Sequence, residues 1–251
     1  MTDVAQVDVL GVKVSAVSMS YAVGRILQWV NEGSSTYVCV TGVHGVMESQ
    51  RDPELMRIHN ESGLTTPDGM PLVWAGRWAG ASRMERVYGP DLMSELIGAS
   101  SKDGVRHYFY GGRPEVVRSL ASALTRRFPD VEVAGIHSPP FRSLTPFEEE
   151  DDIQHINESK ADIVWVGLGT PKQEQWMARL RSKLDAAVLI GVGAAFDIHA
   201  GNIKQAPRWM QRSGLEWLYR LGREPRRLAS RYLRNNPAFV AAILRNPPRL
   251  L

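Results

Sequence analysis

The sequence predicts an α/β fold, namely a Rossmann-like parallel sheet flanked by helices, with a helical C-terminal appendage. Two observations support this prediction. Short β-branched runs alternate with helix-like segments through most of the chain, which is the order of elements in a doubly wound parallel sheet. From Pro207 onward this alternation stops, and only helix-like segments follow. We therefore expect an α/β core over residues 1–206 and a basic helical appendage over residues 207–251.

The expected strands are short apolar runs that end at glycine or proline turns. The run at residues 37–41 is β-branched and continuous, as in a strand buried on both faces. Strands are expected at residues 7–14 as a pair or hairpin, and at 37–41, 64–66, 106–110, 131–136, 162–167 and 187–192.

The expected helices carry capping signals at their first residues. Ser15 or Ser18 can cap the first helix, and Pro53 follows Asp52 at a first helical position. Pro225 is expected to start a new helix in the appendage. Helices are expected up to residue 31, from residue 43, over 53–62 and 72–78, up to residue 100, and over 114–128, 145–160 and 171–180.

Composition restricts the class of protein. The 251 residues are 43% hydrophobic and 23% charged, which is ordinary for a globular domain with a sizeable core. No run approaches the roughly 20 apolar residues of a membrane span, and the first residues show no signal-peptide pattern. The single Cys39 excludes a disulfide framework and a cysteine metal site. These features predict a cytoplasmic location.

Positive charge is concentrated near the C-terminus. From Lys204 onward there are eleven lysines and arginines but only two acidic residues, Glu216 and Glu224, although the whole chain has a net charge of only +3. Such asymmetry points to an anionic partner, which could be a lipid surface, phosphate or nucleic acid. No nucleic-acid recognition motif supports the last of these, so no nucleic-acid partner is expected.

Residues 64–71 present a carboxylate at the end of an expected strand. Pro67 favours an extended backbone at Thr66, and the pair Asp68-Gly69 strongly favours a turn. Open α/β sheets place their ligand-handling groups at the carboxyl ends of strands. Asp68 is therefore a candidate functional carboxylate. The alternative is that Asp68 only caps the next helix.

Three strand-to-helix turns in the second half of the chain contain glycines. Glycine lets main-chain N–H groups approach a phosphate at a helix N-terminus, although at such turns it can also serve packing alone. None has the Walker lysine pattern or the full dinucleotide glycine spacing. Together they predict that a nucleotide diphosphate binds here. The turns are Tyr110-Gly111-Gly112, Gly167-Leu168-Gly169-Thr170 and Gly191-Val192-Gly193.

The segment after the second turn is unusually polar. Lys172 could hold a phosphate or a sugar hydroxyl, whereas Thr170 and Gln173 could instead form a capping box. Asp197, after the third turn, could accept hydroxyl groups of a ribose or sugar, or could cap a helix. His44 follows the strand at 37–41 and is expected only to line the site. The six histidines show no metal-ligand spacing, so no metal site is predicted.

Four motifs in this order and spacing resemble the WecG/TagA/CpsF bacterial glycosyltransferases, glycosyltransferase family 26. The resemblance extends from about residue 9 to about residue 233, and also includes Arg208-Trp209, residues 214–217 and Arg220. The motifs are Thr66-Pro67-Asp68-Gly69, Arg86-Val87-Tyr88-Gly89-Pro90-Asp91-Leu92, Gly167-Leu168-Gly169-Thr170-Pro171-Lys172-Gln173-Glu174 and Gly191-Val192-Gly193-Ala194-Ala195-Phe196-Asp197.

The resemblance implies that a UDP-sugar donates its sugar, with inversion and without a bound metal or cofactor, to a polyprenyl-pyrophosphate-linked saccharide. Asp68 resembles the family's catalytic base, and Arg220 and Arg227 are candidates for stabilising the leaving UDP. The implied process is cell-envelope or exopolysaccharide biosynthesis. The implied sugar is of the N-acetylmannosamine type, its uronic acid, or glucose. The substrate-binding candidates are Thr41, His44, Thr66, Gly69, Arg86, Asp91, Gly111, Gly112, Gly167, Gly169, Thr170, Lys172, Gln173, Gly193, Asp197, Arg220 and Arg227.

One departure from the family bears on the identity of the sugar or acceptor. Many members have asparagine two residues after the threonine that corresponds to Thr41, where this chain has Val43, and the neighbouring His44 could supply a polar contact instead. Two other classes of function remain open: a nucleotide-binding oxidoreductase and a non-catalytic UDP-sugar-binding protein. The first would need an early dinucleotide fingerprint, which the chain lacks.

The appendage also predicts contact with the inner face of the cytoplasmic membrane. Arg227, Arg231 and Arg234 fall at helical spacing, and so do Leu228 and Tyr232, so a basic stripe runs beside an apolar one. This is the composition of a helix lying in a membrane interface. The alternative is an ordinary docking helix whose arginines are solvated. Association of the chain into a homo-oligomer is left open.

Overall fold

The structure is a computed structural model that describes residues 4–251. The chain divides into two compact units. Unit 1 comprises the residues up to Met19, Val40–Tyr88 and Gln205–Leu251, and unit 2 comprises Ser20–Cys39 and Gly89–Lys204. The C-terminal segment thus belongs to the same unit as Val40–Tyr88. The division into a core and an appendage at residue 206 stays a prediction.

The central sheet confirms the predicted fold class. Its strand order is β4-β3-β8-β7-β5-β6, and the pairs β3–β8, β8–β7, β7–β5 and β5–β6 are all parallel. Parallel strands require crossover connections, which explains the alternation of strand and helix in the sequence. The strands are β3 (Thr36–Thr41), β4 (Leu64–Pro67), β5 (Arg106–Gly111), β6 (Glu132–His137), β7 (Ile163–Gly167) and β8 (Val188–Gly191).

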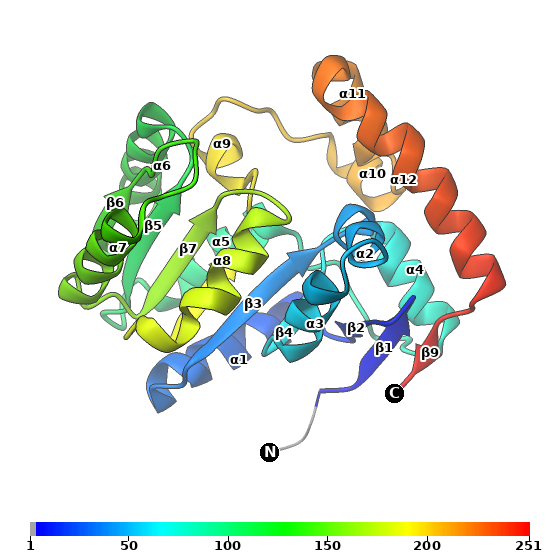
Figure 1. Ribbon diagram of the computed structural model, residues 1–251, viewed down its shortest axis with the longest axis horizontal. Coiled ribbons are helices and arrows are strands. Elements are labelled where there is room, and N and C mark those ends of the chain that lie inside the picture. The colour runs from blue at the N-terminus through cyan, green and yellow to red at the C-terminus, as the bar shows by residue number, and fades with distance from the viewer. Residues whose placement is uncertain (1–3) are drawn as a thin grey trace. The chain divides into compact units, whose positions relative to one another are not determined.

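Helices cover both faces of the unit 2 strands. Helix α6 lies on one face, and α7 and α8 lie on the other (Figure 1). This arrangement follows from right-handed crossovers between β5 and β6, β6 and β7, and β7 and β8. The helices that belong wholly or mostly to unit 2 are α1 (Met19–Glu32), α5 (Gly89–Ser100), α6 (Pro114–Arg127), α7 (Pro146–Glu158), α8 (Lys172–Leu180) and α9 (Ala195–His199).

Unit 1 is built on an N-terminal hairpin that the sequence predicts. Strands β1 (Gln6–Val9) and β2 (Val12–Ser15) pair antiparallel, and their four valines are fully buried in one apolar cluster. Phe239 and Ile243 of the C-terminal helix join the same cluster. The helices of unit 1 are α2 (Val43–Ser49), α3 (Pro53–Glu61), α4 (Met70–Trp78), α10 (Arg208–Arg212), α11 (Glu216–Arg223) and α12 (Pro225–Arg245).

Two capping predictions are confirmed in unit 1. Asp52 accepts hydrogen bonds from the main-chain N–H groups of Glu54 and Leu55, with Pro53 at the first helical position of α3. Pro225 likewise begins α12. Both follow from the fixed φ of proline and from the unpaired N–H groups of a first helical turn.

The C-terminal segment differs from the predicted pattern of helices only. Strand β9 (Arg249–Leu250) pairs antiparallel with β1, so the two strands lie side by side (Figure 1). Pro247 and Pro248 end the helical run before it, and the free main-chain edge of β1 accepts the extended residues that follow.

The apolar stripe predicted on α12 faces the protein and not the outside. Leu228 is fully buried, and the Tyr232 ring packs edge-on against Trp217 with 5.9 Å between centroids. The exposed apolar side chains are Leu233, Val240 and Leu244, which lie on another face of the helix. The prediction assigned the wrong face of α12 to the outside. Sequence spacing shows that apolar residues share one face, but it does not show which face packs against the core. Within residues 4–251, no helix is both long enough and apolar enough to cross a membrane.

A buried histidine helps to join β5 to β7 and α5. The Nε1–H of Trp165 donates to Nδ1 of His107 at 3.1 Å, and Nε2 of His107 lies 3.1 Å from Oγ of Ser100. Because the indole can only donate, Nδ1 must be the acceptor, and Nε2–H therefore donates to Ser100. All three side chains are fully buried. This arrangement needs a neutral imidazole, and burial lowers the pKa of His107 from 6.5 to about 4.

This neutral histidine predicts a loss of stability in acid. Below pH 6.5 the imidazole of His107 binds a proton in the unfolded chain, whereas in the folded protein it stays neutral down to about pH 4. The free energy of unfolding therefore falls as the pH is lowered from 6.5 to about 4. The loss should be about 3 kcal/mol. Urea unfolding between pH 4 and 7 should show it, and His107→Gln should show a shallower dependence. The exposed His155→Gln should retain the parent's slope. Equal slopes in all three proteins would contradict the assignment.

Candidate functional site

The predicted site residues fall into two groups, one in each unit. The members of each group come from the carboxyl ends of strands, the helices that follow and, in unit 1, the C-terminal helices. Unit 1 contains Thr41, His44, Thr66, Asp68, Gly69, Arg86, Arg220 and Arg227. Unit 2 contains Asp91, Gly111, Gly112, Gly167, Gly169, Thr170, Lys172, Gln173, Gly193 and Asp197.

Asp68 lies directly after β4, as the turn chemistry predicts. Its main-chain N–H donates to the carbonyl of Thr41 at 2.9 Å, which fixes it beside the end of β3. Gly69, and not Asp68, occupies the N-cap position of α4. The alternative that Asp68 is the N-cap residue of α4 is therefore wrong.

Two threonines precede Asp68 at the ends of the neighbouring strands. Thr41 is 3% exposed and Thr66 is fully buried. The Oγ1 atoms of both are buried, and neither has a hydrogen-bond partner within residues 4–251. Buried hydroxyl groups usually have a partner, so two such groups at the ends of the strands that adjoin Asp68 mark an unusual position.

Arg86 binds the main chain of Asp68. Its Nε donates to the carbonyl oxygen of Asp68 at 2.6 Å, and its guanidinium lies 3.9 Å above the centre of the Tyr88 ring. The other two guanidinium nitrogens donate to Gln211, at 2.9 Å, and to the carboxylate of Glu216. Arg86 thus connects the loop that carries Asp68 to α10 and α11.

The electrostatic surroundings of Asp68 are mixed in sign. Burial, together with the charges of Glu216 and Asp68, raises the pKa of Tyr88, so its phenol stays protonated. Burial opposes the charge of Arg220, but Tyr232, Tyr88 and the two carboxylates together raise its pKa. The Nε of Arg220 is buried with no hydrogen-bond partner in the described part of the chain. A cation with unused hydrogen-bonding capacity therefore lies in the electrostatic field of Asp68.

Arg227 and His44 make contacts within unit 1. Arg227 pairs with Glu224 at 2.5 Å on the exposed side of α12. Nδ1 of His44 lies 3.1 Å from Nδ2 of Asn235, whose Oδ1 accepts from Arg51 at 2.9 Å. His44 therefore joins α2 to α12, in addition to any part it has in lining the site.

In unit 2 the three glycine turns approach one another closely. Gly111 has φ +118°, and a Cβ placed on it would lie 2.8 Å from both the carbonyl carbon and the oxygen of Gly167. The N–H of Gly112 donates to the same carbonyl at 3.1 Å. A side chain on Gly167 would collide with the Phe196 ring at 2.6 Å. Packing therefore requires glycine at the first two turns.

Gln173 links the turn after β7 to the turn after β8. Its Oε1 accepts from the main-chain N–H of Gly169 at 3.1 Å, and its Nε2 donates to Oε1 of Glu174 at 3.0 Å. A Cβ on Gly193 would lie 3.5 Å from the same Oε1 of Gln173. The hydroxyl of Thr170 also donates to Glu174, at 2.9 Å. The capping box suggested for Thr170 and Gln173 is therefore wrong, because Pro171 occupies the cap position and the two side chains bind Glu174.

The remaining predicted residues of unit 2 lie around these turns. Gly169 has φ +76°, and a Cβ there would meet nothing within 4 Å, so its main chain borders open space. Lys172 is exposed at the first residue of α8. Asp197 lies inside α9 and does not cap it, and its Oδ1 accepts from Asn202 at 3.3 Å. Asp91 is in the first turn of α5.

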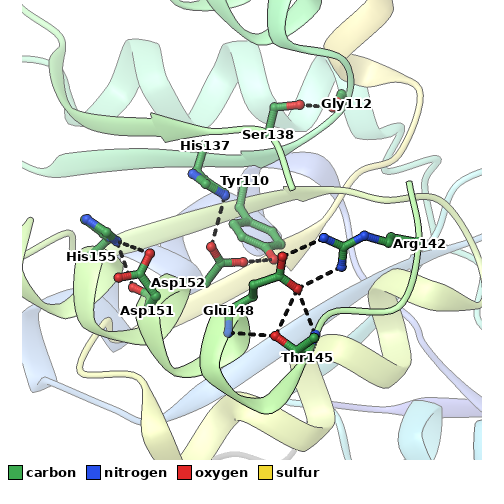
Figure 2. Close-up of polar contacts among 10 residues, drawn as sticks. All are labelled: Tyr110, Gly112, His137, Ser138, Arg142, Thr145, Glu148, Asp151, Asp152 and His155. Atoms are coloured by element: carbon green, nitrogen blue, oxygen red, sulfur yellow. Dashed lines mark hydrogen bonds and ion pairs between the residues drawn. The ribbon is translucent and has the colours of Figure 1, made fainter. Parts of the chain in front are cut away.

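A polar network supports the ends of β5 and β6 (Figure 2). The buried Asp152 accepts a 2.6 Å hydrogen bond from the Tyr110 hydroxyl and contacts Nε2 of His137 at 2.9 Å. This hydrogen bond to Asp152 raises the pKa of His137. Ser138 donates to the carbonyl of Gly112 at 2.6 Å. The glycine turn after β5 is thus held in place by the strand beside it.

Over residues 4–251, no three His, Cys, Asp or Glu side chains gather as the ligands of a metal ion would. The expectation that activity needs no metal or cofactor stays a prediction.

Comparison with known proteins decides the family. The model of the Glycosyl transferase WecG/TagA/CpsF family matches residues 7–250. The chain belongs to this family. The match includes both groups of predicted site residues and both units, so it confirms the resemblance on which the sequence analysis relied.

Two relatives from Bacillus show what this family member is similar to. Both are N-acetylglucosaminyldiphosphoundecaprenol N-acetyl-beta-D-mannosaminyltransferases. The protein from Bacillus subtilis (strain 168) is 32% identical over 68% of this chain and 65% of its own length. The protein from Bacillus spizizenii (strain ATCC 23059 / NRRL B-14472 / W23) is 27% identical over 87% of this chain and 82% of its own length.

Several residues that contact these two groups were not predicted as site residues. Gln211 and Asn235 contact predicted site residues only because α10 and α12 fold against the rest of unit 1, whereas Tyr88 contacts Arg86 from two residues away and stands within a motif that the sequence analysis quoted. Glu216 and Glu174 stand within motifs that the sequence analysis quoted, so their motif position was a signal that they could matter.

The contact between Gly111 and Gly167 predicts a sharp difference between two Gly→Ala variants. Gly111→Ala places a methyl group against the main chain of Gly167 at a positive φ, and should reduce the free energy of unfolding by about 2–4 kcal/mol. Gly24→Ala in α1, where a Cβ meets nothing within 4 Å, should raise it by up to about 1 kcal/mol. Urea unfolding measures both. Equal stability of the two variants would rule out the close approach.

Proposed function

We propose that this chain is an inverting glycosyltransferase that moves a sugar from a UDP-sugar to a polyprenyl-pyrophosphate-linked saccharide. The observation that supports it most is the family match over residues 7–250. In the motif that resembles the family's base motif, Asp68 follows β4, and its main-chain N–H is bonded to the end of β3. This is the position at which open α/β sheets act on their ligands.

In this proposal Asp68 is the general base. Its carboxylate takes the proton from the acceptor hydroxyl as that oxygen bonds to the anomeric carbon, while the bond from that carbon to the UDP oxygen breaks. Attack from the side opposite the leaving group inverts the configuration. A base must lie within hydrogen-bond reach of the hydroxyl it deprotonates. The partnerless hydroxyls of Thr41 and Thr66 are suited to contact polar groups of a substrate close to that oxygen.

Cationic and main-chain groups would stabilise the leaving UDP. Arg220 keeps its charge and has an unused Nε–H, and Arg227 is on the helix that follows. In unit 2, the main chain at Gly169 borders open space and is suited to contact a diphosphate. Preorganised donors of this kind can replace a metal ion in stabilising developing negative charge.

The relatives favour one donor among those implied by the resemblance. Both are named as transferring N-acetylmannosamine to N-acetylglucosaminyldiphosphoundecaprenol, so N-acetylmannosamine is the first donor sugar and this lipid-linked saccharide the first acceptor to test. Val43 begins α2 and packs against the apolar cluster of unit 1, so it offers no polar contact in place of the family's asparagine. The uronic acid and glucose donors are the next candidates.

The exposed face of α12 supports peripheral contact with the cytoplasmic membrane. Leu233, Val240 and Leu244 are 69%, 55% and 66% exposed, and their spacing of seven and four residues puts them on one side of the helix. Arg226 and Arg234 are exposed on the same helix. Leucines with basic neighbours suit the interface of an anionic leaflet, where a lipid-linked acceptor is found. A cytoplasmic enzyme in envelope or exopolysaccharide synthesis would meet its acceptor there.

The base assignment predicts a variant that binds but does not turn over. Asp68→Asn removes the proton acceptor and little else, so release of UDP should fall by about 10²-fold or more. Its affinity for UDP, measured by calorimetry, should stay near the parent value. Parental turnover in Asp68→Asn would show that Asp68 is not the base, whereas UDP binding without turnover in the parent itself would favour a non-catalytic UDP-sugar-binding protein.

The matching variant in unit 2 is Gly169→Val, which should weaken UDP binding because a side chain then occupies the open space at that turn. Far-UV circular dichroism would show that it is folded. Unchanged UDP affinity in a folded Gly169→Val protein would place the nucleotide elsewhere.

The membrane proposal predicts charge-dependent binding to vesicles. Each arginine near an anionic leaflet contributes roughly 1 kcal/mol, so Arg226→Glu with Arg234→Glu should reduce partitioning roughly 30-fold or more. Replacing Leu233, Val240 and Leu244 with serine should also reduce it. Co-sedimentation with anionic and neutral vesicles measures both effects, and Arg126→Glu in α6 is the control. If both variants pellet as fully as the parent, α12 does not bind lipid.

A further inference from the structure

Arg86 connects the proposed base to the C-terminal helices through three separate hydrogen bonds. One goes to the carbonyl of Asp68 at 2.6 Å, one to Gln211 at 2.9 Å, and one to the carboxylate of Glu216. The side chains of Arg86 and Glu216 are only 14% and 15% exposed. A shielded guanidinium with acceptors on three elements is held far more firmly than one in a surface ion pair.

The two C-terminal acceptors are themselves held in place. Gln211 is 4% exposed, and its Nε2 donates to the carbonyl of Ala206 at 2.8 Å, which leaves its Oε1 directed at Arg86. Glu216 lies close enough to Tyr88 for its charge to raise the pKa of that phenol, and the Tyr88 ring lies under the guanidinium of Arg86. Gln211 therefore cannot turn away from Arg86 without losing a second bond.

Hydrogen bonds hold the main chain of Asp68 from two sides. Its N–H donates to Thr41 on one side, and its carbonyl accepts from Arg86 on the other. The next residue, Gly69, has no side chain and caps α4 without a side-chain hydrogen bond. If Arg86 lost its C-terminal partners, the Asp68–Gly69 peptide could rotate, and the carboxylate would move with it.

We propose that Gln211 and Glu216 are positioning residues for the reaction, because they hold Arg86 on the carbonyl of Asp68 and so direct its carboxylate toward the acceptor hydroxyl. This inference rests on the proposed function only in calling Asp68 the base. It gives α10 and α11 a role in catalysis that does not depend on any contact with the substrate.

Kinetics test the proposal first. Glu216→Gln keeps the shape of the side chain but removes its charge, and Gln211→Leu removes the acceptor. Misplacing a catalytic group by about 1 Å costs about 10²-fold in rate, so kcat should fall between about 10- and 10²-fold in each variant. The KM for the UDP-sugar should stay within about twofold of the parent value, because these changes do not remove a contact that binds the UDP-sugar in the ground state. Parental kcat in both folded variants would overturn the proposal.

A double-mutant cycle tests whether Glu216 acts through Arg86. Arg86→Ala and Glu216→Ala are measured singly and together. If Glu216 acts through Arg86, the double variant should lose no more than about twofold beyond Arg86→Ala alone, because the coupled residues share one effect. Losses in kcat that multiply would show that Glu216 acts independently, and would overturn the proposal.

Amide hydrogen exchange supplies a measurement that does not need activity. Exchange in the peptide covering residues 64–72 should become about tenfold faster in Glu216→Gln and Gln211→Leu. The control is Glu54→Gln, which removes an exposed ion pair with Arg57 elsewhere in unit 1 and should leave this peptide unchanged. Unchanged exchange in all three variants would overturn the positioning role.

The exchange measurement also separates this proposal from the proposed function. If Asp68→Asn keeps parental turnover, Asp68 is not the base, whatever the exchange shows. If Asp68→Asn is inactive but the Gln211 and Glu216 variants exchange and turn over as the parent does, then the base assignment stands and the positioning role fails.

Discussion

Parallel pairing of the strands is the constraint on which the candidate site depends. The strands β3, β8, β7, β5 and β6 run in the same direction. The turns that follow these strands therefore all lie at the same edge of the sheet, where the strands end. Neighbouring turns then have to fit side by side, and at Gly111 and Gly167 only glycine leaves enough room. Two of the glycines that suggest phosphate binding in the sequence are thus required by packing: Gly111 by the neighbouring turn of the sheet, and Gly167 by the Phe196 ring of α9. Gly169 is different, because open space and not packing surrounds it.

Much of the fold could be predicted because local signals and the global arrangement agree. Continuous β-branched runs became buried parallel strands, and Asp52 with Pro53 began α3 as the capping rules require. Strand β9 could not be predicted in this way. Its two residues have no pattern of their own, and they are extended because the edge of β1, more than two hundred residues earlier, offers hydrogen bonds.

Site residues that stand in a local turn could be predicted from the sequence. Site residues that are brought together from distant parts of the chain could not. Asp68 and the glycines stand in recognisable local motifs. Gln211 and Glu216 contact Arg86 from more than 120 residues away, and no spacing rule relates them. The helix α12 shows the same limit, since Leu228 and Leu233 look alike in the sequence although one is fully buried and the other is 69% exposed. Only the folded unit decides which apolar side the protein covers.

The pairing of β9 with β1 also has a consequence for the order of folding during synthesis. Unit 2 ends at Lys204, so all of its residues can leave the ribosome while the C-terminal helices are still being made. The hairpin of unit 1 emerges first but is completed last, because Phe239 and Ile243 fill its apolar cluster and Arg249–Leu250 cover the edge of β1. Until then the nascent chain has an open strand edge beside an incompletely filled apolar cluster, which is the kind of surface that chaperones bind. Among the described strands, β1 therefore waits longest for one of its partners, β9.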